Sequence, residues 1–175
     1  DKIEYDKEME TAVISFSKSL TLGNTILSLT FHGTLRDDLR GFYKSTYTVN
    51  DTEKILATTQ FEATDARKCF PCFDEPAQKA IFAVTLVVPK ELTAISNMPI
   101  KKETLLGPTK RAEFEKTPIM STYLLAFLIG EFEGIEKKTK NNILVRVFTT
   151  PGKKEQGRFG LGVAVKSLEY YHDYF

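Results

Sequence analysis

The chain has 175 residues, of which 42% are hydrophobic and 27% are charged. These proportions are typical of a soluble globular domain with a buried core, and they do not indicate a disordered chain. A formal net charge of +1 gives no basic surface for nucleic acid, and no apolar run of about 18 residues is present to span a bilayer. We therefore expect neither nucleic acid nor a membrane among its partners.

The first 150 residues are dominated by β-strand signals. Four early segments alternate β-branched or aromatic residues with other side chains, and they are 12–16, 25–31, 43–49 and 55–61. Turn residues separate the segments, among them Gly23-Asn24 and Asn50-Asp51. This pattern predicts hairpins of an antiparallel sheet.

Further strand signals follow between residues 80 and 148. Residues 80–88 carry apolar side chains on both faces apart from one threonine, which predicts a strand buried on both sides. Three more strands are expected at 112–115, 121–131 and 143–148.

The pattern changes at Thr150-Pro151-Gly152, after which apolar residues recur at intervals of three and four. These residues are Leu161, Val165, Leu168, Tyr171 and Phe175. The spacing predicts an amphipathic helix over 153–175, with Pro151 near its first turn. We expect residues 1–150 to form one all-β domain and residues 151–175 to open a second domain.

Residues 57–79 combine charges, prolines and aromatic rings more densely than the rest of the chain. A simple connection is usually short and polar, so we expect a loop that buries its rings and directs its charges toward a function. Period-two alternation places Gln60 and Glu62 on one face and Phe61 on the other.

Cys69 and Cys72 form a Cys-x-x-Cys pair within this segment. A tetrahedral zinc site needs two more ligands, and both histidines, His32 and His172, stand alone in the sequence. We therefore expect free thiols, which fit a reducing compartment. The amino-terminal sequence also lacks the pattern of a signal peptide, so a cytoplasmic location is expected.

Four blocks of sequence resemble, in the same order, the zinc aminopeptidases of the gluzincin class. The blocks are Thr-Gln-Phe-Glu-Ala-Thr-Asp-Ala-Arg at 59–67, Phe-Pro-Cys-Phe-Asp-Glu-Pro at 70–76, Ala-Ile-Ser-Asn-Met-Pro at 94–99 and Met-Ser-Thr-Tyr-Leu-Leu-Ala-Phe at 120–127. Shorter matches at 87–90, 145–148 and 155–157 bring the chain closest to the puromycin-sensitive type. The resemblance extends from about Gly41 to Phe175.

The resemblance implies an amino-terminal antiparallel domain, a saddle-like sheet or sandwich that lacks its first strand or two, followed by one helix that begins a missing catalytic domain. The family's His-Glu-x-x-His zinc helix and its Gly-Ala-Met-Glu-Asn exopeptidase motif do not occur in this sequence. We therefore expect zinc only in the intact enzyme. This chain alone is expected to hold no catalytic residue and no metal ligand, and to be inactive.

The resemblance also implies two substrate-binding residues. Glu62 matches the acidic residue that binds the substrate's free amine, and Gln60 matches a residue that lines the first side-chain pocket. A fixed carboxylate is well suited to detect an ammonium group. The expected partners are peptides with a free amino terminus and the enzyme's own catalytic domain.

Two other interpretations stay open at this point. The first is a noncatalytic β-sandwich used for binding or scaffolding. In this interpretation Glu62 forms a structural ion pair with Arg67. The other is a self-contained serine or cysteine hydrolase, which is disfavoured because the sequence has no Gly-x-Ser-x-Gly elbow. The remaining charges of the segment are expected to brace the loop, and they are Asp65, Arg67, Asp74 and Glu75.

Overall fold

A computed structural model describes residues 2–175 and shows sheets followed by a single α-helix within that range. The described strands form two hairpins, one three-stranded sheet and one four-stranded sheet. All of the pairings between these strands are antiparallel. The predicted all-β class with a carboxy-terminal helix is confirmed.

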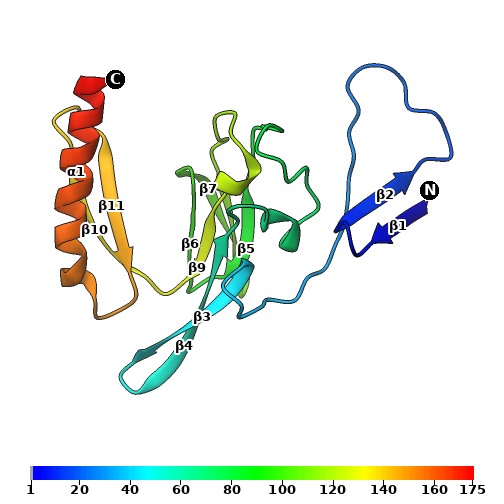
Figure 1. The fold of residues 1–175 in the computed structure, drawn as a ribbon. Coiled ribbons are helices and arrows are strands. Elements are labelled where there is room, and N and C mark those ends of the chain that lie inside the picture. The colour runs from blue at the N-terminus through cyan, green and yellow to red at the C-terminus, as the bar shows by residue number, and fades with distance from the viewer. Residues whose placement is uncertain (1) are drawn as a thin grey trace.

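The amino-terminal hairpin lies apart from the other sheets (Figure 1). It pairs β1 (Lys2–Asp6) with β2 (Thr11–Ser15), and almost all of its side chains are exposed. An isolated two-stranded hairpin is at best marginally stable in water. One ion pair joins its turn to the rest of the molecule, between Glu10 Oε2 and Arg67 Nη1 at 3.3 Å.

The four-stranded sheet forms the centre of the molecule. Its strands, in spatial order, are β3 (Gly41–Val49), β4 (Thr52–Gln60), β9 (Phe127–Gly130) and β6 (Thr93–Ser96). The first two form a long hairpin whose turn residues, Asn50 and Asp51, have φ of 47° and 59°. Tight two-residue hairpin turns often require positive φ, which asparagine and aspartate tolerate well.

The three-stranded sheet packs against the four-stranded sheet through a shared apolar core. Its order is β5 (Thr85–Pro89), β8 (Thr109–Phe114) and β7 (Ile100–Leu106). Val88 and Phe114 from this sheet are buried together with Ala94 of β6. The two sheets are therefore held together by side-chain burial, since no pairing between their strands is found in residues 2–175.

The carboxy-terminal unit consists of a hairpin and the helix, side by side at one end of the molecule (Figure 1). Strands β10 (Glu133–Lys138) and β11 (Leu144–Thr149) pair with each other, and α1 (Gly157–Tyr174) follows a 3₁₀ turn at Lys154–Gln156. Val145, Leu161 and Val165 form its buried cluster. The helix predicted from the apolar spacing is confirmed, and it begins at Gly157.

Two strand predictions are wrong and a third holds only in part. Residues 25–31 form no strand. They have the alternation that favours a strand, but a strand also needs a hydrogen-bonded partner. Of the predicted strand 80–88, only residues 85–88 form strand, as part of β5. This strand lies at the edge of its sheet, and Val87 is exposed, so the strand is not buried on both sides as predicted. The expected long strand at 121–131 is divided into a 3₁₀ turn at Thr122–Leu124 and the short β9.

Candidate functional site

The end of β4 presents the two residues that the sequence resemblance assigns to the substrate. Gln60 is the last residue of the strand and pairs with Gly41 of β3. Gln60 and Glu62 are exposed, whereas Phe61 between them is only 2% exposed. This pattern matches the predicted alternation. Both polar side chains therefore reach solvent while the intervening ring fixes the backbone in the core.

Phe61 anchors the start of the loop that follows β4. Its ring lies edge-on to the rings of Phe70 and Phe127, with centroid distances of 5.8 Å and 6.1 Å. Aromatic pairs prefer such geometry, which adds to the burial of apolar area. Ala66 and Leu125 are buried in the same cluster. The loop and β9 thus share one small core directly behind the exposed pair.

The carboxylate of Glu62 has no hydrogen-bond or ion-pair partner among residues 2–175. The peptide bond between Glu62 and Ala63 is cis. Arg67, the cation considered as its partner, binds Glu10 and Asp74 instead. The structure therefore does not contain the Glu62–Arg67 ion pair that the scaffolding interpretation requires.

Arg67 and Asp74 brace the loop, as their expected structural role requires. The main-chain N and the Nε of Arg67 donate to Oδ2 of Asp74 over 3.1 Å and 3.0 Å. The hydrogen bond with Asp74 is also the main cause that raises the pKa of the Arg67 guanidinium. Asp74 is buried, so its charge is compensated mainly by this arginine. The result is a closed loop of eight residues.

Two hydroxyl groups hold the second half of the loop against the 3₁₀ turn at Thr122–Leu124. Ser121 Oγ donates to the carbonyl of Pro76 over 2.6 Å, and Thr122 Oγ1 donates to the carbonyl of Phe73 over 3.2 Å. The ring of Phe73 is nevertheless 82% exposed. The expectation that the loop buries its rings is therefore wrong for Phe73, because its main chain is held while its side chain faces outward.

Gly41 positions this region, and the sequence analysis did not identify it. Its φ is +66°, and a Cβ at this position would lie 2.8 Å from Cβ of Lys68. Only glycine accommodates both the backbone conformation and this close approach. The 3₁₀ turn Ala66–Lys68 can therefore pack over the start of β3, next to Gln60. A glycine two residues before the predicted strand 43–49 was the available signal.

Cys69 and Cys72 are free thiols that are partly buried. Burial raises the pKa of each thiol to about 11, so both are protonated near neutral pH. Metal ligation and nucleophilic attack both require the thiolate. Within residues 2–175, no three His, Cys, Asp or Glu side chains lie close enough together to hold a metal ion. The donors within residues 2–175 therefore do not fit zinc.

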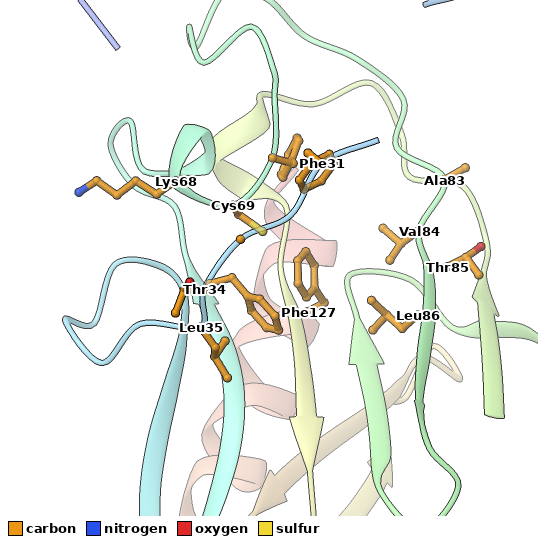
Figure 2. Close-up of a pocket in the computed structure, with 13 residues that line it drawn as sticks. Phe31, Thr34, Leu35, Lys68, Cys69, Ala83, Val84, Thr85, Leu86 and Phe127 are labelled. Atoms are coloured by element: carbon orange, nitrogen blue, oxygen red, sulfur yellow. The ribbon is translucent and has the colours of Figure 1, made fainter. Parts of the chain in front are cut away.

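A separate pocket of about 620 Å³ lies between residues 31–35 and 83–86 (Figure 2). Its lining is mainly apolar and comes from Phe31, Gly33, Thr34, Leu35, Phe42, Lys68, Cys69, Phe70, Ala83, Val84, Thr85, Leu86 and Phe127. Lys68 extends away from the other lining side chains (Figure 2). Because neither Gln60 nor Glu62 lines this pocket and it contains no carboxylate, it is distinct from the proposed amine site.

The family comparison agrees with the sequence blocks. The model of the Peptidase M1 N-terminal domain matches residues 1–124, which is more than half of the chain. The chain belongs to this family. No helix within residues 2–175 is both long and apolar enough to cross a membrane.

Curated relatives of this M1 domain are aminopeptidases by name. Aminopeptidase M1-B of Oryza sativa subsp. japonica is 52% identical over 169 residues, covering 97% of this chain and 19% of that relative. Puromycin-sensitive aminopeptidase of Caenorhabditis elegans is 46% identical over 98% of this chain and 18% of its own length. Aminopeptidase N of Bos taurus is 42% identical over 100% of this chain and 19% of its own length. The chain thus spans about a fifth of these relatives, and the resemblance to aminopeptidases is confirmed.

Proposed function

We propose that this chain is the amino-terminal β-domain of a zinc-dependent aminopeptidase that removes single residues from the amino termini of peptides. The observation that carries the proposal is the exposed carboxylate of Glu62, unpartnered within residues 2–175, inside a sequence block shared with that family. The names of the relatives support the class of reaction.

Glu62 binds the free ammonium group of the substrate. An exopeptidase must distinguish the end of a peptide from its interior, and the end carries a positive charge that the interior lacks. A charge-assisted hydrogen bond to a carboxylate just beyond the end of β4, next to the buried Phe61, sets the distance from this charge to the scissile bond. The attraction is weak in open water and becomes strong once the rest of the enzyme excludes solvent.

Gln60 lies two residues earlier, at the end of β4, and is exposed like Glu62. Its amide is uncharged and has both donors and an acceptor, so it lines a pocket without repelling either a basic or an acidic side chain. We assign it to the wall of the first side-chain pocket. The wall opposite Gln60 comes from sequence outside this chain.

Zinc and the catalytic groups belong to the rest of the intact enzyme, because the donors described between residues 2 and 175 do not fit the metal. The chain contributes binding and orientation, and alone it is inactive. Free cysteines agree with a cytoplasmic location, where thiols stay reduced.

The test replaces the aligned 169-residue segment of rice aminopeptidase M1-B with this chain and then introduces Glu62→Gln. The loss of one charge-assisted contact is expected to raise KM for an aminoacyl fluorogenic amide by about tenfold or more, with unchanged thermal stability. Glu53→Gln is the matched control, because Glu53 is an exposed glutamate on β4, the strand that precedes Glu62. An unchanged KM for the Glu62 variant would reject the assignment.

A further inference from the structure

The turn that presents Glu62 also carries a second acid, Asp65. The main-chain N of Asp65 donates to the carbonyl of Phe61 over 2.9 Å, so both acids lie in one closed turn of five residues. Phe61 and Ala66 are buried at either end of this turn. Two carboxylates in one small turn give a substrate's ammonium group two places to bind, and only one of them can lie at the right distance from the scissile bond.

The carboxylate of Asp65 is already bound by an ammonium group of the chain itself. Lys68 Nζ lies 2.8 Å from Asp65 Oδ1, and the two side chains are 25% and 16% exposed. Glu62 has no hydrogen-bond or ion-pair partner among residues 2–175. The ammonium group of a lysine is chemically like the amino terminus of a peptide. The turn therefore offers one carboxylate to a ligand, because Lys68 takes the place of a ligand at the other.

The local geometry of the chain explains this pair. Asp65 directly precedes the 3₁₀ turn Ala66–Lys68, and at three residues per turn the side chains of Asp65 and Lys68 lie one above the other. An aspartate in this position often accepts a hydrogen bond from the main chain of the helix, but Asp65 accepts none there. Its carboxylate is therefore available to Lys68.

A second acid near Lys68 has a partner of its own. The guanidinium of Arg36 is the main cause that lowers the pKa of Asp38, and Lys68 is a minor one. Arg36 Nε donates to Asp38 Oδ2 over 2.7 Å. Asp38 therefore does not draw Lys68 away from Asp65.

Lys68 also lies next to the other proposed substrate residue. A Cβ at Gly41 would lie 2.8 Å from Cβ of Lys68 and 3.3 Å from the carbonyl oxygen of Asp65. Gly41 pairs with Gln60 at the end of β4. The side chain of Lys68 extends away from the apolar pocket (Figure 2). The ion pair is thus held against the strand end that presents Gln60 and within the loop that presents Glu62.

We propose that Lys68 is a positioning residue, which keeps Asp65 from binding the substrate's ammonium group so that within this turn the amine binds Glu62. This inference rests on the proposed function, because it takes Glu62 to be the amine-binding carboxylate. An amine bound at Asp65, three residues further along the chain, holds its peptide out of line with the catalytic groups. Lys68 acts through Asp65 and does not itself contact the substrate.

Loss of the Lys68 charge has a specific kinetic signature. In Lys68→Met the apolar stem stays over Gly41, while Asp65 loses its cation. Two carboxylates of equal affinity divide the bound amine and halve kcat, and Asp65 is less hydrated than the exposed Glu62, so we expect kcat to fall by about two- to fivefold. KM falls by the same factor and kcat/KM stays nearly unchanged, because substrate held at Asp65 is bound but unreactive.

The kinetic test uses the chimera in which this chain replaces the aligned segment of rice aminopeptidase M1-B, with an aminoacyl fluorogenic amide as substrate. Lys68→Arg retains the charge and is expected to keep the parent kcat. Asp65→Asn added to Lys68→Met removes the competing carboxylate and is expected to restore kcat. Lys110→Met is the matched control and should leave kcat and KM unchanged, because Lys110 forms an ion pair with Glu103 at 3.2 Å in the three-stranded sheet.

An unchanged kcat for Lys68→Met would overturn the inference. A loss of kcat that Asp65→Asn does not restore would also overturn it, because Lys68 would then act by a route other than Asp65. Glu62→Gln in the same chimera separates the two proposals. If Glu62→Gln raises KM and Lys68→Met changes nothing, only the role of Lys68 is wrong. If Glu62→Gln leaves KM unchanged, the amine site is wrong and the role of Lys68 falls with it.

Carboxylate labelling supplies a readout that needs no turnover, and it decides the question if a variant of the chimera does not fold. The chain alone is treated with a water-soluble carbodiimide and glycine ethyl ester, and the modified residues are quantified by mass spectrometry. Glu62 is expected to react about fivefold faster than Asp65, because Lys68 covers the Asp65 carboxylate. Lys68→Met should abolish this difference by raising the reactivity of Asp65. Equal reactivity of the two acids in the unaltered chain would overturn the inference.

Discussion

Arg67 and Asp74 are joined by two hydrogen bonds to one carboxylate oxygen, from the main-chain N at 3.1 Å and from Nε at 3.0 Å. Because Asp74 is buried, Arg67→Ala leaves its charge with one donor fewer. We expect a loss of about 2 kcal/mol in the free energy of unfolding, measured by urea denaturation. Arg111→Ala removes an exposed pair with Glu113 and should cost less than about 0.5 kcal/mol. Equal losses for the two variants would show that the Arg67 contact does not brace the loop.

Phe61 and Phe73 are two phenylalanines of one loop with opposite exposure. Phe61→Ala removes a ring that packs against Phe70 and Phe127, and it should destabilise the chain by about 3–5 kcal/mol. Phe73→Ala should change stability by no more than about 0.5 kcal/mol, because the ring is solvated. Urea midpoints compare the two variants, and a large cost at Phe73 would mean that its ring is covered in solution.

Gly41 and Gly107 share a φ of +66°, but they differ in what surrounds them. A Cβ at Gly41 meets Lys68 Cβ at 2.8 Å, whereas a Cβ at Gly107 meets no atom within 4 Å. Alanine at Gly107 should cost about 1 kcal/mol from backbone strain. Alanine at Gly41 should cost at least about 1 kcal/mol more, because the 3₁₀ turn must move. Thermal melts compare the two variants, and equal midpoints would contradict the close packing at Gly41.

Leu161 and Val163 occupy opposite sides of α1. Leu161→Ala opens a cavity against the β10–β11 hairpin and should cost about 2–4 kcal/mol. Val163→Ala should be nearly neutral in the chain alone, since Val163 is exposed there. Denaturation of both variants checks this order. A larger loss for Val163→Ala than for Leu161→Ala would show that Leu161 is not on the buried side of the helix.

Cys69 and Cys72 should respond to pH together. Burial raises the pKa of each thiol from 9.0 to about 11, so the folded state keeps these protons after the unfolded state has lost them. Their contribution to stability is therefore complete below about pH 9 and is lost as the pH rises through about 11. Alkylation by iodoacetamide should stay slow near pH 9 in the folded chain and be fast in urea. A plateau of the folded rate above about pH 9 would contradict the raised pKa values.

Sequence periodicity predicted those parts of the molecule whose pattern is local. The exposure of Gln60 and Glu62 around the buried Phe61 agrees with the predicted alternation, although β4 itself ends at Gln60. The helix over Gly157–Tyr174 follows from apolar spacings of three and four. Each of these results depends on neighbours within a few residues along the chain.

Strand formation depended on partners that no local pattern reveals. Strand β7, with the sequence Ile-Lys-Lys-Glu-Thr-Leu-Leu, and strand β10, with Glu-Gly-Ile-Glu-Lys-Lys, are too polar to be predicted, yet each pairs along a neighbouring strand. Residues 25–31 show the reverse, since they have the alternation and no partner strand among residues 2–175. Strand propensity is decided largely by such contacts.

The same division applies to the candidate site. The order of residues along the chain was sufficient to identify the motif block by its resemblance to a family, and period-two alternation predicted its exposed acid and its buried ring. Only the tertiary structure showed that Arg67 pairs with Asp74 and that Gly41 lies against Lys68. It also showed that the side of α1 that carries Phe159 and Tyr170 is exposed. These contacts join residues brought together by folding, and a loop with many charges permits several pairings until burial selects one of them.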